Sequence, residues 1–193
     1  VYDGILYLTS ARNRLMALDA KTGELYWRYD HPNPDDLRIC CGPANRGVAI
    51  AGDVVLMATL DAKLVALHRK TGEIVWETRI SDGGVLGGIE WGFASDGETV
   101  FASISDALEK APGDAGGMVA VRIADGDVVW EAPPFQDTCG TRQGCHTAQP
   151  GAVTAIPGVV FSGSLDGHIR AYATDTGNVI WDVDTVGEID TVN

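Results

Sequence analysis

Short runs in which apolar and polar residues alternate follow one another along the whole chain. Apolar runs such as 5–8 (ILYL) lead through a polar turn to alternating runs such as 63–67 (KLVAL); the runs are four to seven residues long. Alternation over such lengths is typical of β-strands, and the chain lacks the three-to-four-residue spacing of an amphipathic helix. The pattern predicts an all-β protein of short strands joined by hairpins.

One ten-residue segment occurs four times, first as LDAKTGELYW at 18–27, and in each copy a Trp stands four residues after a Gly. Successive Trp residues of these copies are 49, 54 and 51 positions apart. Each Gly supplies the positive φ of a tight hairpin, and each Trp is expected to pack one sheet against the next. We therefore interpret these Trp residues as structural. The four pairs are Gly23 and Trp27, Gly72 and Trp76, Gly126 and Trp130, and Gly177 and Trp181.

A period near fifty residues, with hairpin turns inside each unit, is typical of a β-propeller built from four-stranded antiparallel blades. We expect residues 1–193 to form a single partial β-propeller domain of about four blades, because four units would leave an unpaired face at each end. The chain is then about half of a larger ring, and a closed ring of four blades is the less favoured alternative. The expected repeats cover approximately 1–30, 48–80, 81–132 and 151–184.

Charge and hydropathy exclude several classes of partner. The formal net charge is −13, and a nucleic-acid partner or an anionic membrane surface would require a basic face instead. No apolar run is long enough to cross a bilayer. The acidity is explained by solubility alone.

The four cysteines form two local pairs, Cys40 with Cys41 and Cys139 with Cys145. An even count with local pairing indicates disulfides, and therefore an oxidising compartment such as the periplasm. Cys139 and Cys145 enclose a short Gly-containing turn, which favours a local disulfide. Neither pair has the spacing of a zinc site, and the spacing before Cys145-His146 is too long for covalent haem.

The adjacent pair Cys40-Cys41 has unusual geometry. Neighbouring Cα atoms lie about 3.8 Å apart, whereas an unstrained disulfide requires roughly 4.4–6.8 Å. A bond between these residues is therefore possible only as a strained ring, of the kind that persists where a site uses it. Two buried, reduced thiols are the alternative.

The segment CCGPANRG at 40–47, followed by TLDAKLVAL at 59–67 and KTGE at 70–73, resembles the quinoprotein alcohol dehydrogenases. The resemblance implies a periplasmic eight-bladed propeller that holds pyrroloquinoline quinone (PQQ) and a calcium ion on its axis. It further implies that Cys40 and Cys41 form a disulfide ring against one face of the quinone, and that Arg46 pairs with a quinone carboxylate. A planar tricarboxylate suits a flat wall and a guanidinium fork.

Trp91, in the segment GGIEWG at 87–92, is the one Trp outside the repeat position. It is either a core aromatic residue or, as the resemblance implies, the residue that stacks on the other face of PQQ. Residues 83–193, especially this segment, the second Cys pair and IPGVVFSGSLDGHIRAY, look most like the polyvinyl alcohol dehydrogenases of the same superfamily.

The third repeat carries extra residues at 105–114, and insertions in one repeat often carry function. In the family this blade supplies a Glu that binds calcium, which makes Asp106 and Glu109 the candidate ligands. A solvated charged loop is the alternative, because the family's Gly-Ala-Glu wording is absent. The family's catalytic Asp matches Ser164 here, so the catalytic residue stays unidentified, and Asp166 is interpreted as a turn residue.

Two functions are consistent with the sequence. The first is PQQ-dependent oxidation of an alcohol to an aldehyde or ketone, with electrons passing to a c-type cytochrome; the fragment alone is not expected to turn over. The second is a propeller without cofactor that binds proteins in the cell envelope, like the scaffold lipoproteins of outer-membrane assembly. The fold alone does not separate them. The Cys40-Cys41 and Arg46 motif favours the enzyme.

Overall fold

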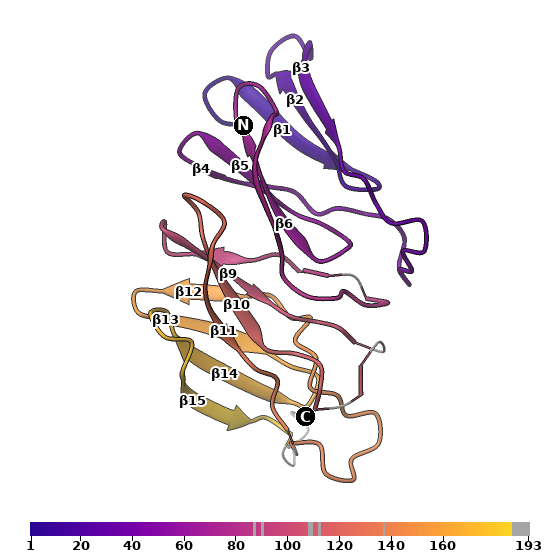
Figure 1. The fold of residues 1–193 in the computed structure, drawn as a ribbon, viewed down its shortest axis with the longest axis vertical. Helices are drawn as coiled ribbons and strands as arrows, with labels where there is room; N and C mark the ends of the chain where they lie inside the picture. The colour runs from indigo at the N-terminus through magenta and orange to yellow at the C-terminus, as the bar shows by residue number, and fades with distance from the viewer. Residues whose placement is uncertain (87, 90, 108–109, 112, 137, 187–193) are drawn as a thin grey trace, which may run out of the picture.

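The computed structural model describes residues 1–86, 88–89, 91–107, 110–111, 113–136 and 138–186. Four antiparallel sheets follow one another in chain order along the long axis of the molecule, from the indigo N-terminal sheet to the yellow C-terminal sheet (Figure 1). The described residues contain fifteen strands and no helix, so no helix there could cross a membrane. The prediction of an all-β chain of about four blades is confirmed.

Each sheet is a simple meander, in which every strand pairs with its neighbour in sequence. Three sheets have four strands, as predicted, whereas the first has three among the described residues. The strands are β1 (Ile5–Ser10), β2 (Arg14–Asp19) and β3 (Leu25–Asp30); β4 (Ala49–Ala51), β5 (Val54–Ala58), β6 (Lys63–His68) and β7 (Ile74–Arg79); β8 (Ala94–Ser95), β9 (Thr99–Ser103), β10 (Met118–Arg122) and β11 (Val128–Ala132); β12 (Thr154–Ile156), β13 (Val159–Gly163), β14 (His168–Ala173) and β15 (Val179–Asp184).

The repeat Trp residues join successive sheets. A side-chain carbon built on Gly72 would lie 2.6 Å from the ring of Trp27, so only glycine lets the indole approach this closely. The Trp27 indole N–H donates to the Arg69 carbonyl oxygen at 3.0 Å, three residues before that glycine. Trp76 makes the same pair of contacts in the next repeat, at Gly126 and the Ile123 carbonyl. Trp130 does so at Gly177 and the Thr174 carbonyl, so the predicted packing role is confirmed for these three residues. Trp181, in the last sheet, is 48% exposed.

Among the described residues, buried apolar side chains form four clusters, of which three lie between successive sheets and a small fourth one consists of Ala107, Ala115 and Ala148. Between the first two sheets, Leu15 and Trp27 from one side meet Val55 and Leu67 from the other. Strands buried on both faces explain the nearly continuous apolar runs of β5, β6 and β10. The arrangement leaves the loops, and not the sheet faces, available for a site.

The long connections between sheets and the turns between the second and third strands of the four-stranded sheets lie on one side of the molecule, at the right of Figure 1. Backbone hydrogen bonds tie neighbouring loops together there. Arg12 N donates to the Pro43 carbonyl at 2.8 Å, and Cys40 N donates to the Val85 carbonyl at 2.7 Å. This side brings segments 31–48 and 80–93 into contact and carries the candidate site.

Candidate functional site

A cavity of about 220 Å³ lies between the connections, lined by residues from 39–49, 58–60 and 86–93. Cys41, Arg46 and Trp91 all line it. Three of the four side chains predicted to bind the cofactor therefore meet at one place, although Trp91 is distant from the other two in sequence.

The structure contains the bond between Cys40 and Cys41, whose Cα atoms lie 3.8 Å apart. Both residues are exposed, so the alternative of two buried thiols does not hold in this structure. The hydrogen bond from Cys40 N to the Val85 carbonyl holds the ring against the next connection. Cys41 thereby forms part of the cavity wall.

Arg46 and Trp91, which both line the cavity, are in direct contact. The guanidinium carbon of Arg46 lies 4.3 Å from the centroid of the Trp91 ring, which is a cation–π contact. Trp91 is 54% exposed, whereas Trp27, Trp76 and Trp130 are 8–9% exposed. Trp91 is therefore not a core aromatic residue, and its indole presents a broad apolar surface to solvent.

Asp106 does not line this cavity. Its side chain is 2% exposed, Oδ1 accepts a hydrogen bond from Gly83 N at 3.0 Å, and Oδ2 lies 3.2 Å from Lys110 Nζ. Glu109 lies outside the described residues. Within the described ranges, no group of three or more His, Cys, Asp or Glu side chains could hold a metal ion. Calcium binding by Asp106 and Glu109 stays a prediction.

Asp106 belongs to a set of three turn aspartates, with Asp61 and Asp166. In each of the three sheets, one residue just after the second strand still donates a backbone hydrogen bond to the third strand or its approach, and the aspartate lies two residues further on. Each aspartate is at most 4% exposed. Each binds the connection that precedes its own sheet: Asp61 binds His31, and Asp166 binds Thr138. The equivalence of Asp61, Asp106 and Asp166 was not predicted from the sequence. Aligning the three repeats on the strands before these turns, β5, β9 and β13, would have shown it.

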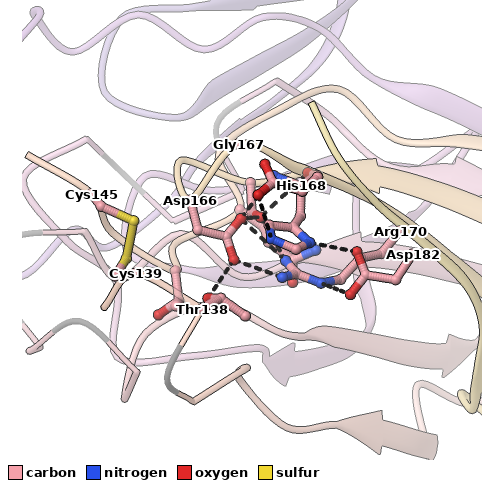
Figure 2. A network of polar contacts seen from close by, with 12 residues as sticks. Thr138, Cys139, Cys145, Asp166, Gly167, His168, Arg170 and Asp182 are labelled. Carbon is pink, nitrogen blue, oxygen red and sulfur yellow. Dashed lines mark hydrogen bonds and ion pairs between the residues drawn. A yellow bond between two sulfur atoms is a disulfide. The ribbon is translucent and has the colours of Figure 1, made fainter. Parts of the chain in front are cut away.

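The fourth turn contains a network of polar contacts (Figure 2). Asp166 Oδ2 accepts hydrogen bonds from Arg170 Nη2 at 2.6 Å and from Thr138 Oγ1 at 2.7 Å. The Arg170 side chain is fully buried, and its guanidinium lies 3.8 Å from the centre of the Phe135 ring. Burial alone would raise the pKa of Asp166, but hydrogen bonds from Arg170, Ser164 and Thr138 hold that pKa well below its ordinary range.

Ser164 donates its hydroxyl proton to Asp166 and accepts from Arg170 Nη1 at 2.6 Å. It lies in this network and not at the cavity, so it takes no part in the candidate site. The second disulfide, Cys139–Cys145, is present beside the network, with its Cα atoms 5.5 Å apart. This disulfide closes the loop 139–145, and Thr138, the residue just before that loop, donates the hydrogen bond to Asp166.

The fold and the cavity define a run of propeller blades of the PQQ-repeat class. A family model described as outer membrane protein assembly factor BamB, PQQ_2, matches residues 1–86 and again 82–193. The chain belongs to this family.

Curated relatives include a polyvinylalcohol dehydrogenase of Pseudomonas sp., 35% identical over 191 residues, with 89% of this chain and 30% of that protein covered. The quinoprotein ethanol dehydrogenase of Pseudomonas aeruginosa is 38% identical over 162 residues, covering 80% and 25% respectively. The predicted resemblance to both groups is confirmed. The chain spans less than a third of the length of these relatives.

Solved structures share the fold. A europium-containing methanol dehydrogenase superposes with a TM-score of 0.75 at 22% identity, over 94% of this chain and 40% of that one. BamB from Moraxella catarrhalis superposes with a TM-score of 0.67 at 19% identity, over 93% and 49%. Enzymes and assembly factors therefore use the same blades, and the cavity has to separate the two functions.

Proposed function

We propose that this chain contributes cofactor-binding blades to a PQQ-dependent alcohol dehydrogenase that oxidises an alcohol to an aldehyde or ketone. The observation that carries the proposal is the convergence of Cys41, Arg46 and Trp91 on one cavity. The names of the relatives support the reaction class.

The chemistry of the cavity fits a flat, anionic quinone. Arg46 offers a guanidinium fork to a carboxylate, and no carboxylate of the described residues pairs with it. Trp91 offers an exposed aromatic face, and the Cys40–Cys41 ring offers an apolar wall. The cavity volume of about 220 Å³ is below the roughly 300–1,000 Å³ of complete ligand pockets, so these residues form one flank of the site.

Each of these residues has a separate task in the proposed site. When bound, the quinone supplies the redox chemistry by taking up the two electrons that the alcohol loses. Arg46 orients the ring through its carboxylate, while Trp91 and the Cys ring cover its faces and exclude water. No Asp, Glu or His is among the described residues that line this cavity, so none of those residues is a candidate for taking the hydroxyl proton of the alcohol.

The proposal includes a calcium ion and a c-type cytochrome as electron acceptor, both implied by the resemblance. Asp106 would have to exchange its contacts with Gly83 and Lys110 to bind calcium. A periplasmic or otherwise secreted location is supported by the two disulfides, which persist in oxidising compartments.

The test is equilibrium binding of PQQ, with and without calcium, to the protein and its variants. Arg46→Ala is expected to weaken binding roughly 10- to 150-fold, because a hydrogen bond to a charged group contributes about 1.5–3 kcal/mol. A Cys40→Ser/Cys41→Ser variant should also bind less tightly, since the quinone loses one wall. Calcium is expected to strengthen binding.

The matched control is Cys139→Ser/Cys145→Ser. Losing the bond that closes this short loop should lower the free energy of unfolding by about 2 kcal/mol while leaving the affinity for PQQ unchanged. Wild-type protein that binds no PQQ, or equal affinity in all variants, would favour the alternative of a protein-binding scaffold in the cell envelope. Dye-linked alcohol oxidation by the complete ring is the second measurement.

A further inference from the structure

We infer that Asn13 is a positioning residue for the cavity, because its buried amide oxygen holds two segments of the cavity wall in place. The inference deepens the proposed function and rests on it for the identity of the ligand. Asn13 lies in the turn between β1 and β2, in a different sheet from the segments that it holds.

The Asn13 side chain is fully buried, and its Oδ1 accepts two hydrogen bonds from the second repeat. One comes from Asn45 Nδ2 at 3.1 Å and the other from Leu60 N at 3.1 Å. Asn45 and Leu60 both line the cavity. A single oxygen therefore fixes the loop that carries Arg46 relative to the turn that forms another part of the wall.

Asn45 extends this control to Arg46 itself. Its Nδ2 donates a further hydrogen bond to the Ala58 carbonyl at 2.7 Å, and its Oδ1 accepts one from Gly47 N at 3.2 Å. Arg46 thus lies between two residues whose positions depend on the Asn45 amide. A long, exposed arginine loses rotamer freedom when it binds a ligand, and a fixed backbone lowers the remaining cost of ordering.

The backbone at residue 13 restricts which side chains can take this role. Its φ is 56°, in the left-handed region, where Asn, Asp and Gly are the residues usually found. Glycine would accept the conformation without supplying an acceptor. Asn13 combines the required backbone geometry with an uncharged oxygen that can accept two hydrogen bonds in a buried place.

The joint between the first two sheets does not depend on this amide, because Trp27 and the apolar cluster hold it. Asn33 provides a matched control in the same region. It accepts a hydrogen bond from Asn13 Nδ2 at 2.7 Å and donates to the Arg12 and His31 carbonyls, but it does not line the cavity. A merely structural contribution should appear equally in variants of both residues.

The experiment compares Asn13→Gly with Asn33→Ala by two measurements, the dissociation constant for PQQ and the hydrogen exchange of peptides spanning 42–60. Asn13→Gly should weaken PQQ binding about tenfold and accelerate exchange of the Gly47 and Leu60 amides. Asn33→Ala should lower Tm about as much as Asn13→Gly does. It should leave the dissociation constant for PQQ and the hydrogen exchange of 42–60 near their wild-type values.

Three outcomes are distinguishable. Wild-type affinity in Asn13→Gly, or equal weakening in both variants, overturns the inference. Unchanged exchange over 42–60 in Asn13→Gly overturns it as well. If the wild type binds no PQQ but only Asn13→Gly loosens 42–60, the positioning of Arg46 stands and the proposed ligand is wrong.

Discussion

The turns of the second and fourth repeats have nearly the same sequence but different surroundings. Each has a hydroxyl residue, a Leu, an Asp and a small residue, at 59–62 and 164–167. Asp61 accepts a hydrogen bond from His31 Nε2 at 2.9 Å, and its buried Oδ2 has no hydrogen-bond partner among the described residues. Asp166 uses both oxygens and forms a buried ion pair with Arg170.

The difference shows that the repeat determines the position of the aspartate in the turn. The connection that precedes each sheet supplies a partner of that aspartate and so determines the role of the turn. At the second turn, Leu60 lines the cavity and its backbone N–H binds the neutral amide of Asn13. At the fourth turn, Leu165 is 47% exposed and the Asp–Arg pair anchors the disulfide-closed loop. The turn beside the candidate site is therefore held by a neutral side chain, Asn13. The fourth turn, which does not line the cavity, is held by the charged pair of Asp166 and Arg170.

The largest expected effect is that of Asp166→Ala. Removing one partner of a buried ion pair costs about 3–5 kcal/mol where the other charge stays buried without compensation. Arg170 is fully buried but keeps its 3.3 Å contact with Asp182, so we expect a cost at the lower end of that range. Chemical denaturation should show this loss of unfolding free energy. Leu165→Ala, at an exposed position of the same turn, should change it by less than about 0.5 kcal/mol. Equal effects of the two variants would contradict the anchoring role.

Asp61→Ala is expected to cost less, about 1–3 kcal/mol, the range for a buried donor left without its acceptor. Loss of Asp61 leaves the His31 imidazole without one hydrogen-bond partner, whereas loss of Asp166 leaves a buried guanidinium. Lys63, the other neighbour, keeps its 2.6 Å contact with Glu77. The measurement is the same denaturation series, and a cost above that of Asp166→Ala would reverse the comparison. A Tyr29→Phe variant tests whether the hydrogen bond to His31 Nδ1 contributes as well.

Much of the fold could be predicted from the sequence because the repeat is local. The alternation of residues, the Asp-x-x-Thr-Gly turns and the period near fifty residues all indicate the same sheets, and the indole contacts follow from them. The first sheet differs, with three strands instead of four.

The candidate site was only partly predictable. The grouping of Cys41, Arg46 and Trp91 came from a resemblance, and it depends on how two connections fold over each other. Nothing in the local sequence indicates that Asn13 reaches the second repeat. The place of Asp106 in a charged insertion makes it a candidate metal ligand, and its equivalence to Asp61 and Asp166 becomes visible only from the register of β9 and β10.

The smallest expected effect is a difference between Asp61 and Asp166 in how their contribution to the free energy of unfolding depends on pH. Burial alone would raise the pKa of Asp61, but hydrogen bonds from His31 and Thr59 outweigh it, so the pKa lies below its ordinary value, as it does more strongly for Asp166. A lowered folded-state pKa stabilises the protein above the unfolded pKa of about 3.9, and this contribution disappears as the pH falls through the folded pKa.

The difference in unfolding free energy between the wild type and Asp166→Asn should therefore stay constant from pH 7 to about pH 5. Below about pH 4 it should narrow by at most about 1.4 kcal/mol per unit of pH. The corresponding difference for Asp61→Asn should narrow less, because the pKa of Asp61 is lowered less than that of Asp166. Asp19, whose pKa is lowered to about 2 chiefly by the Tyr26 hydroxyl, is the exposed control, and solvent should leave Asp19→Asn with the weakest dependence. A difference that stays constant down to about pH 2 in both variants would show that neither buried carboxylate acts through its charge. The contrast between the two turns would then rest on hydrogen bonds alone.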